Sequence, residues 1–332
     1  MYSKITGLGY YVPDNVVTNH DLTQLMETSD EWIRERTGIG ERRFFTYGKE
    51  TNASMATAAS RQAIERAGLQ PSDIEMIVYA TITPDYFFPG SGFLMQRELD
   101  LIGIPVIDIR EQCSGFVYAL SIADQYIKSG AYKTILVVGA EIQSTWTDKS
   151  TKGRNVAVIF GDGAGAAVVQ ATPDPTHRVL STHLHADGRF AEDLYIKEPG
   201  SSRPTRAATH EMIDEGGFDV VMNGNAVFKH AVVRFAEAIN EALQANGCQS
   251  SDISLLVPHQ ANIRISEFVR QQMGLREDQV YNNIHKFGNT TAASIPIALC
   301  EAWEEGRVKE GDLVCLAAFG SGFTWASALI RW

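Results

Sequence analysis

Short apolar runs alternate with longer helical patterns along this chain. The apolar runs lie at 74–80, 104–109, 134–139, 156–160, 253–257 and 313–318. The helical patterns between them cover 53–67, 114–128, 226–245, 261–273 and 294–305. A strand that is buried on both faces is apolar at every position, and such strands belong to mainly parallel sheets covered by helices. The alternation therefore predicts an α/β fold, with its most loop-like stretch at 197–217.

The chain also matches itself at one spacing. Residues 67–74 (AGLQPSDI) align with 246–253 (NGCQSSDI), and the two aspartates are 252 − 73 = 179 positions apart. Residues 135–139 (ILVVG) align with 313–317 (LVCLA), at 313 − 135 = 178. Two independent segments at nearly the same offset indicate an internal duplication. We therefore expect two similar α/β halves with a pocket where they meet.

Composition narrows the class of protein. With 332 residues the chain is long enough to bury a large core, and 44% hydrophobic with 21% charged residues is typical of a globular protein. The 29 basic and 40 acidic residues give a net charge of −11, which disfavours a general nucleic-acid binder. No leader pattern and no apolar run of 18 residues is visible, so we expect a cytoplasmic protein without a membrane partner.

Cys113 stands out among the cysteines because of its place in the chain. The others are Cys248, Cys300 and Cys315, and no C-x-x-C pair occurs, so neither a zinc ribbon nor a dithiol redox motif is expected. We expect all four thiols to be reduced. Cys113 follows an apolar strand and opens a helical segment. The positive end of a helix lowers the pKa of a thiol slightly, whereas burial raises it. Cys113 is therefore a candidate nucleophile if another group assists it, and otherwise a core residue.

His259 and Asn289 are the candidate partners of that thiol. His259 follows the strand 253–257, and sites form at the carboxyl ends of parallel strands. Asn289 lies just before a helix, where its simplest role is a helix cap. At the offset of 178, however, Cys113 maps near Thr291, so the Asn289 loop occupies in the second half the place of the cysteine in the first. We expect all three side chains to meet in one central cavity.

Two glycine-rich turns are further candidates for a binding function. Residues 161–166 (GDGAGA) fit the G-x-G-x-x-A pattern of a dinucleotide-binding turn, but residues 166–169 predict a strand where that fold needs a helix. This disfavours a nucleotide-binding oxidoreductase. The turn Gly320-Ser321-Gly322 is the counterpart in the second half. Such turns can expose backbone N–H groups to a developing oxyanion.

A set of motifs spread along the chain is specific to one family. They are 29–32 (SDEW) with 36–39 (RTGI), 113–116 (CSGF), 160–167 (FGDGAGAA), 222–225 (MNGN) with 227–229 (VFK), 257–262 (VPHQAN), 287–290 (FGNT) and 318–325 (AFGSGFTW). With them the chain resembles β-ketoacyl-[acyl-carrier-protein] synthase III nearly from end to end. The resemblance implies a thiolase fold, in which two duplicated α/β halves form a five-layer α-β-α-β-α body. It places the nucleophile in residues 1–175 and the histidine and asparagine in 176–332.

The resemblance also implies roles for individual residues. Cys113 would accept the acyl group, and His259 and Asn289 would bind the malonyl thioester carbonyl. The backbone N–H groups of Cys113 and Ser321 would form the oxyanion hole. The implied coenzyme A contacts are Trp32, Arg36, Arg154, Asn225, Phe228 and Asn262. The implied primer-pocket residue is Phe88, acting across a homodimer, and the implied carrier-protein docking residues are Lys229 and Arg264.

The implied reaction is a decarboxylative Claisen condensation. An acyl-CoA primer loads Cys113, malonyl-acyl-carrier-protein loses CO₂, and the resulting enolate attacks the bound acyl group. The product is 3-oxoacyl-acyl-carrier-protein, which starts fatty-acid synthesis. Neither a metal nor a redox cofactor is implied, and the expected partners are acyl-CoA, malonyl-acyl-carrier-protein and a second copy of the chain.

Some positions depart from the family pattern. Glu111 and Gln112 precede the nucleophile where small residues are usual, Asn155 follows Arg154 in place of glycine, and Ser321 replaces the middle of a glycine run. These changes bear on primer identity more than on reaction class. A related condensing enzyme or acyltransferase of secondary metabolism, with a longer or unusual primer, is therefore an alternative. A non-catalytic acyl-CoA-binding protein is the alternative from a different class.

Overall fold

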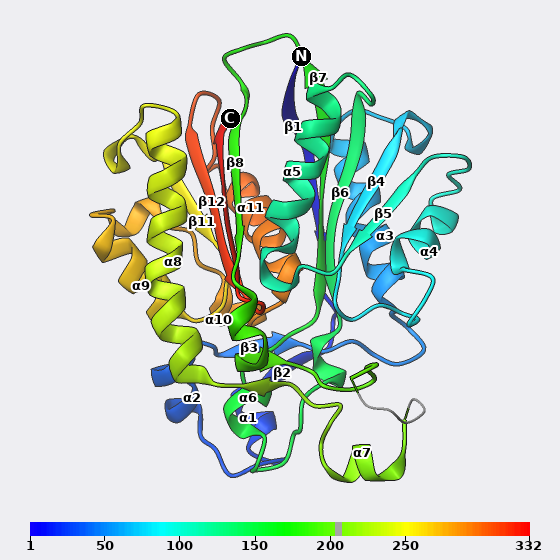
Figure 1. Cartoon of the computed structure of the whole chain (residues 1–332), viewed down its shortest axis with the longest axis vertical. Helices are drawn as coiled ribbons and strands as arrows, with labels where there is room; N and C mark the ends of the chain where they lie inside the picture. The colour runs from blue at the N-terminus through cyan, green and yellow to red at the C-terminus, as the bar shows by residue number, and fades with distance from the viewer. Residues whose placement is uncertain (203–207) are drawn as a thin grey trace.

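Two β-sheets lie side by side, with two helices between them (Figure 1). The computed structural model describes residues 1–202 and 208–332. The first sheet has the strand order β1-β7-β6-β4-β5 and the second has the order β8-β13-β12-β11. The strands of the first sheet are β1 (Tyr2–Tyr11), β4 (Met76–Ala80), β5 (Val106–Ile109), β6 (Thr134–Glu141) and β7 (Gly163–Thr172). Those of the second are β8 (Arg178–Ala186), β11 (Leu255–Pro258), β12 (Leu313–Gly320) and β13 (Thr324–Arg331).

The two sheets share one topology. In each, a parallel pair (β4 with β6, β11 with β12) is followed by two antiparallel strands (β7 and β1, β13 and β8). The connecting turns match as well, since Gln70 with Asp73 and Gln249 with Asp252 form the same capping box 179 residues apart. The predicted duplication is thus visible in the fold. The predicted boundary at 175/176 falls in the connection between β7 and β8.

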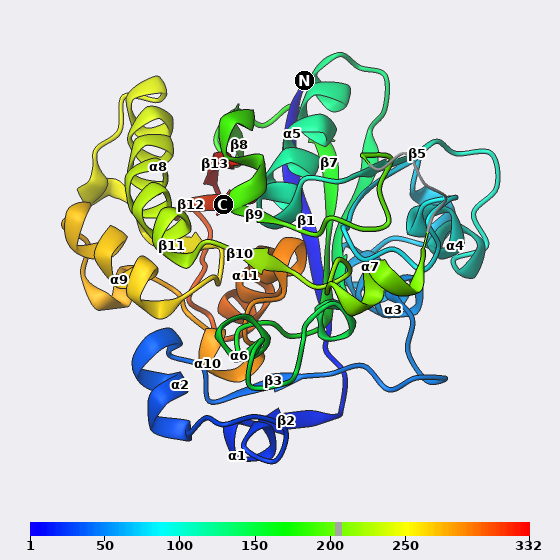
Figure 2. The same ribbon diagram turned by 60° about the horizontal axis from the view of Figure 1, so that its bottom comes forward.

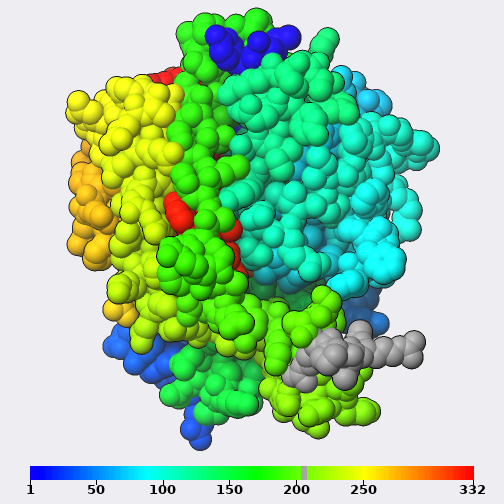
Figure 3. Space-filling view, viewed as in Figure 1, coloured from blue at the N-terminus to red at the C-terminus, as the bar shows by residue number. Residues whose placement is uncertain are grey.

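Helices cover both sheets and separate them, which makes five layers (Figures 1 and 2). The outer helices are α3 (Asn52–Arg66) and α4 (Ser91–Glu98) on the first sheet, and α8 (Gly224–Ala245) and α9 (Ile263–Gln272) on the second. The central helices are α5 (Gly115–Lys128) and α11 (Ser294–Glu304). Both central helices are apolar around most of their circumference because they are buried between two sheets. Figure 3 shows the halves in contact along their length, mainly teal and cyan on the right and yellow and orange on the left.

Smaller elements gather at the lower end of the molecule in Figure 1. They are β2 (Val16–Thr18), α1 (Asn19–Leu22), α2 (Asp30–Thr37), β3 (Glu41–Arg43), α6 (Arg154–Ala157), β9 (Leu194–Tyr195), α7 (His210–Asp214), β10 (Val221–Met222) and α10 (Ile284–Phe287). In the part of the chain that the structure describes, no helix has the length and apolar character needed to cross a membrane.

The predicted strand at 156–160 is wrong. The segment forms α6 and a loop instead, and the strand that follows begins at Gly163. Its apolar character comes from another kind of burial, since Ala157 and Val158 pack with Ile33 and Ile284 in a cluster below the sheets. The other predicted strands and helices are present with ends shifted by a few residues, and the strand at 166–169 lies in β7. The predicted loop at 197–217 contains α7, and its residues 203–207 lie outside the described residues.

Candidate active site

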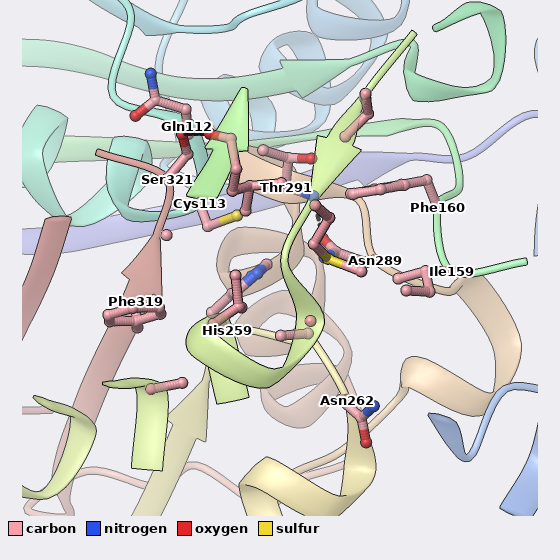
Figure 4. A pocket seen from close by; sticks show the side chains of 18 of the residues that line it. Gln112, Cys113, Ile159, Phe160, His259, Asn262, Asn289, Thr291, Phe319 and Ser321 are labelled. Atoms are coloured by element: carbon pink, nitrogen blue, oxygen red, sulfur yellow. Dashed lines mark hydrogen bonds between the residues drawn. The ribbon is translucent and has the colours of Figure 1, made fainter. Parts of the chain in front are cut away.

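A pocket of about 450 Å³ is lined by residues from both halves of the chain. Cys113 comes from the turn before α5, His259 from the end of β11, and Asn289 from the loop after α10. Figure 4 shows the thiol, the imidazole and the carboxamide arranged around the same space. The structure therefore brings together the three side chains that the sequence singled out.

The turn that presents Cys113 is tightly packed. Gln112 has a left-handed backbone with φ of 41°. Cys113 is the middle residue of a short 3₁₀ turn, Gln112–Ser114, which leads directly into α5. The end of β12 approaches this turn so closely that a Cβ on Gly320 would lie 2.8 Å from the Cβ of Cys113 and 3.0 Å from its nitrogen. Only glycine fits at that position without displacing the cysteine.

The environment of the Cys113 thiol contains opposing influences. Burial raises its pKa to about 12, and the carboxyl group of Glu141 acts in the same direction. The backbone N–H groups of Cys113 and Ser321 lower the pKa because they point toward the sulfur. The thiol is thus protonated at rest, and two backbone N–H groups lie close to its sulfur.

His259 is held by the fold through its backbone and through one ring nitrogen. Its backbone N–H donates to the carbonyl of Ala317 at 2.8 Å, which ties it to β12. Its Nδ1 lies 2.6 Å from the Oγ of Ser294. Its Nε2 is buried and has no hydrogen-bond partner among the described residues. Burial lowers the pKa of the imidazole to about 3, so the ring is neutral at physiological pH.

Asn289 is fixed through its backbone and its Oδ1. Its backbone N–H donates to Ile159 at 2.9 Å and its carbonyl accepts from Gly161 at 3.1 Å. Oδ1 accepts the N–H of Thr291 at 2.9 Å, and Thr291 has a left-handed backbone with φ of 51°. No described residue accepts from the Nδ2 of Asn289, so this group is free to donate into the pocket. A neutral imidazole and an amide facing one space can together stabilise an enolate oxygen.

Aromatic and basic side chains surround the other end of the pocket. Trp32 and Arg36 line it, and the Arg36 guanidinium lies 4.5 Å from the centre of the Trp32 ring. Arg154 does not line the pocket but lies 5.0 Å from the same ring. Phe228 and Asn262 also line the pocket, and Asn262 donates to the carbonyl of Arg36 at 2.8 Å.

The remaining predicted residues lie outside the pocket. Asn225 and Lys229 are exposed near the start of α8. Arg264 is exposed on α9, with its guanidinium 5.8 Å from the centre of the Phe228 ring. Phe88 is 80% exposed and contributes nothing to the pocket of its own chain. The sequence predictions included no role for Ser294, which lies behind His259, and none for the apolar wall formed by Leu194, Ile196 and Val220.

The pocket offers a nucleophile and hydrogen-bond donors rather than a metal centre. Across residues 1–202 and 208–332, no three side chains of His, Cys, Asp or Glu are grouped so that they could hold a metal ion. The sulfur, the imidazole Nε2 and the amide Nδ2 are the polar atoms placed for chemistry. Acyl transfer to sulfur and stabilisation of an enolate are the reactions that these atoms support.

Comparisons with known proteins agree on one family. Residues 107–188 match the family model 3-oxoacyl-[acyl-carrier-protein (ACP)] synthase III, and 243–332 match the model of its C-terminal part. The chain is 47% identical to a β-ketoacyl-[acyl-carrier-protein] synthase III of Rhodospirillum centenum, with 99% of each chain covered. It is 46% identical to that of Salmonella paratyphi B over the full length of both. The crystal structure of 3-oxoacyl-[acyl-carrier-protein] synthase III from Aquifex aeolicus superposes with a TM-score of 0.91 at 42% identity, covering 99% of this chain and 100% of that one.

Proposed function

The chain belongs to the β-ketoacyl-[acyl-carrier-protein] synthase III family, and we propose that Cys113, His259 and Asn289 are its catalytic residues. It is a condensing acyltransferase that joins an acyl-CoA primer to malonyl-acyl-carrier-protein and starts fatty-acid synthesis. The observation that carries the residue assignment is that one thiol and two unpartnered donors line the same pocket.

In the first half-reaction the sulfur of Cys113 attacks the carbonyl carbon of the acyl-CoA thioester. The thiol gives up its proton, the carbon–sulfur bond to coenzyme A breaks, and coenzyme A leaves as its thiol. The backbone N–H groups of Cys113 and Ser321 hold the oxyanion of the tetrahedral intermediate. Their influence on the Cys113 pKa supports this role because it requires them to approach the sulfur.

In the second half-reaction malonyl-acyl-carrier-protein occupies the emptied pocket and loses CO₂. The electron pair of the broken bond becomes an enolate, whose oxygen accepts from the Nε2–H of His259 and the Nδ2–H of Asn289. The enolate carbon then attacks the acyl carbonyl on Cys113, the carbon–sulfur bond breaks, and 3-oxoacyl-acyl-carrier-protein is released. The departing Cys113 thiolate takes a proton from water, which restores the thiol. Because two half-reactions share one sulfur, the kinetics are ping-pong.

The test of this assignment separates the two half-reactions. Incubation with a mixture of acyl-CoA thioesters, followed by intact-mass measurement, should show one acyl group on the protein and none on Cys113→Ala. His259→Ala and Asn289→Ala should still load the acyl group but fail to decarboxylate malonyl-acyl-carrier-protein. Acyl loading of Cys113→Ala, or unchanged decarboxylation by both His259→Ala and Asn289→Ala, would contradict the assignment of these catalytic residues.

We propose that coenzyme A enters along the aromatic and basic end of the pocket. Trp32 offers an indole face near two guanidinium groups, those of Arg36 and Arg154, which suits an adenine ring with its phosphates. Phe228 and Asn262 line the same pocket and are proposed to contact the pantetheine arm, and the exposed Asn225 is proposed to contact it as well.

The carrier protein is proposed to dock beside this entrance on Lys229 and Arg264. Both are exposed, and neither forms an ion pair within the described residues, whereas Arg270 on the same helix as Arg264 is held by Glu267 at 2.6 Å. A local positive patch is needed because the chain as a whole is acidic. Arg264→Glu should raise the KM for malonyl-acyl-carrier-protein at low salt and leave acyl-CoA loading unchanged. An unchanged KM would exclude this surface.

The chain is proposed to act as a cytoplasmic homodimer without metal or redox cofactors. β5 is the last strand of its sheet, so one of its edges is unpaired. Next to it Tyr86, Phe87 and Phe88 are exposed. Pairing of this edge with a second copy would cover these aromatic residues and bring Phe88 toward the partner's primer pocket. Light scattering of the purified chain tests the dimer, and a monomer at micromolar concentration would contradict it.

A further inference from the structure

The contacts of His259 point to a second residue on which its function depends. We infer that Ser294 is a positioning residue whose hydroxyl donates to Nδ1 of His259 and thereby holds the imidazole in the tautomer that carries hydrogen on Nε2. This inference rests on the proposed role of His259 as a donor to the enolate.

The position of Ser294 leaves its hydroxyl little choice of partner. It is the first residue of α11, only 1% exposed, and it is not part of the pocket lining. Its Oγ lies 2.6 Å from Nδ1 of His259 and 3.4 Å from the backbone nitrogen of Gln260. The backbone N–H of Gln260 is a donor, so the Oγ of Ser294 accepts this hydrogen bond with one of its lone pairs. The hydroxyl hydrogen remains for Nδ1.

No competing acceptor takes that hydrogen. Serine hydroxyls near a helix start often bond to a carbonyl of the preceding turn. Here the carbonyl of Thr290 accepts from the N–H of Ala293 at 3.0 Å, and no described carbonyl accepts from Ser294. The hydrogen-bond inventory of a neutral imidazole then fixes the outcome, because a ring that accepts at Nδ1 carries its single hydrogen on Nε2.

The tautomer decides what the pocket can do. With hydrogen on Nε2, the ring donates to an enolate oxygen. With hydrogen on Nδ1, the Nε2 lone pair would face that oxygen and repel it. An imidazolium ring would carry hydrogen on both nitrogens and could donate from either. Burial lowers the pKa of His259 to about 3, so this form is absent at neutral pH and the tautomer of the neutral ring matters.

The same tautomer excludes a second role. A ring that accepts at Nδ1 and donates at Nε2 has no lone pair left for the proton of Cys113. His259 is therefore not the base of the acyl-loading step. Loss of Ser294 should slow the malonyl half-reaction and leave the acyl-CoA half-reaction intact, a division that general destabilisation of the pocket would not produce.

The test compares four variants in both half-reactions. Ser294→Ala removes the hydroxyl, Ser294→Thr keeps it, and His259→Ala removes the donor itself. Ser327→Ala is the matched control, because Ser327 is equally buried and its hydroxyl makes one bond of 2.7 Å, to Ala238, outside the pocket. Acyl loading is followed by intact mass from acyl-CoA. Decarboxylation of malonyl-acyl-carrier-protein is followed on the loaded enzyme.

We expect Ser294→Ala to slow decarboxylation roughly tenfold or more, but by less than the 10²–10³ typical of deleting a donor. Its acyl loading should stay close to that of wild type, because that half-reaction does not use the Nε2 donor of His259. Ser294→Thr should recover most of the decarboxylation rate, and Ser327→Ala should change neither step. Equal losses in both steps, or an unchanged decarboxylation rate, would overturn the inference.

A readout on the unmodified enzyme keeps the inference testable if Ser294→Ala does not fold. In protein labelled with ¹⁵N-histidine, the ring signals that vanish in His259→Ala belong to His259, and they should show hydrogen on Nε2 and an acceptor at Nδ1. Hydrogen on Nδ1 would overturn the inference. The proposed function fails separately, if His259→Ala decarboxylates normally.

Discussion

The turns before the two central helices are built alike and used differently. Gln112 precedes α5 and Thr291 precedes α11, 179 residues apart, and both have left-handed backbones although neither is glycine. Such residues cost of order 1–3 kcal/mol each and persist only where the surroundings enforce them. The next residue is Cys113 in the first turn and Ala292 in the second. One turn presents a sulfur to the pocket, while the other packs a methyl group into the contact between the halves.

This contrast shows what the duplication contributes to the site. The second turn sits so close to the first sheet that a Cβ on Gly139 would overlap the carbonyl of Ala292. With Ala292 confined to packing, the polar groups of the second half stand to either side of it, on Asn289 before the turn and Ser294 after it. Under the proposed mechanism, the first half would supply the nucleophile and the second half would supply the donors.

The largest effect should come from removing the sulfur of the first turn. Cys113→Ala should form no acyl adduct and no condensation product, because the covalent intermediate has no other attachment point. Cys248→Ala, which changes a cysteine outside the pocket, serves as the control and should load normally. Intact mass after incubation with acyl-CoA measures both. An acyl adduct on Cys113→Ala would contradict the proposal that the first turn carries the nucleophile.

The next effect concerns the donor beside the second turn. Asn289→Asp keeps an oxygen for the N–H of Thr291 but replaces the Nδ2 donor with an acceptor. Decarboxylation should fall by about 10²–10³, as when one oxyanion donor is lost. Acyl loading of Cys113 should be nearly unchanged, since the donor acts only on the malonyl group. Comparable decreases in the two rates would show that Asn289 acts in both half-reactions.

Packing of the second turn against the first sheet gives a stability prediction. Gly139→Ala should destabilise the fold by about 1–3 kcal/mol, the usual range for overpacking a well-filled core. Gly188→Ala is the control, because a Cβ there meets no atom within 4 Å and the backbone is not left-handed. Thermal unfolding of both variants decides the question. A melting temperature of Gly139→Ala equal to that of the control would show that the turn at Ala292 moves to make room for the added methyl group.

An effect that depends on pH should come from Glu141, the counterpart of Gly320 at the offset of 179. Its carboxyl group is fully buried and accepts from the hydroxyls of Thr81 and Thr83. Burial raises its pKa to about 8, from about 4.5 in the unfolded chain. The folded state thus binds a proton that the unfolded state releases, and stability is lost as pH rises through this window.

Glu141→Gln should flatten that pH dependence, because a neutral amide has no proton to lose. The melting temperatures of wild type and variant, followed from pH 5 to pH 8, should be closest at the acidic end, where Glu141 is protonated and neutral like the amide. They should diverge at the alkaline end, where only the wild type has lost stability. Parallel curves would show that Glu141 does not titrate in this range.

The sequence predicted the fold from two patterns, the alternation of apolar runs with helices and the offset of about 179. The failure at 156–160 shows the limit of the first pattern, because an apolar run reports burial and not the partner that buries it. Cys113, His259 and Asn289 could be picked out since each lies where a strand ends or a helix begins. Ser294 could not, because its importance arises from its distance to Nδ1 of a residue 35 positions away.

The proposal that one pocket binds both thioesters has a consequence for regulation. It concerns how the turnover rate responds to coenzyme A, which the first half-reaction releases. Under that proposal, free coenzyme A and malonyl-acyl-carrier-protein would compete for the same pocket once Cys113 carries its acyl group. A rising concentration of coenzyme A would thus slow the binding of malonyl-acyl-carrier-protein. It would also favour transfer of the acyl group from Cys113 back to coenzyme A. The turnover rate would then depend on the ratio of acylated to free coenzyme A as well as on the concentration of the primer.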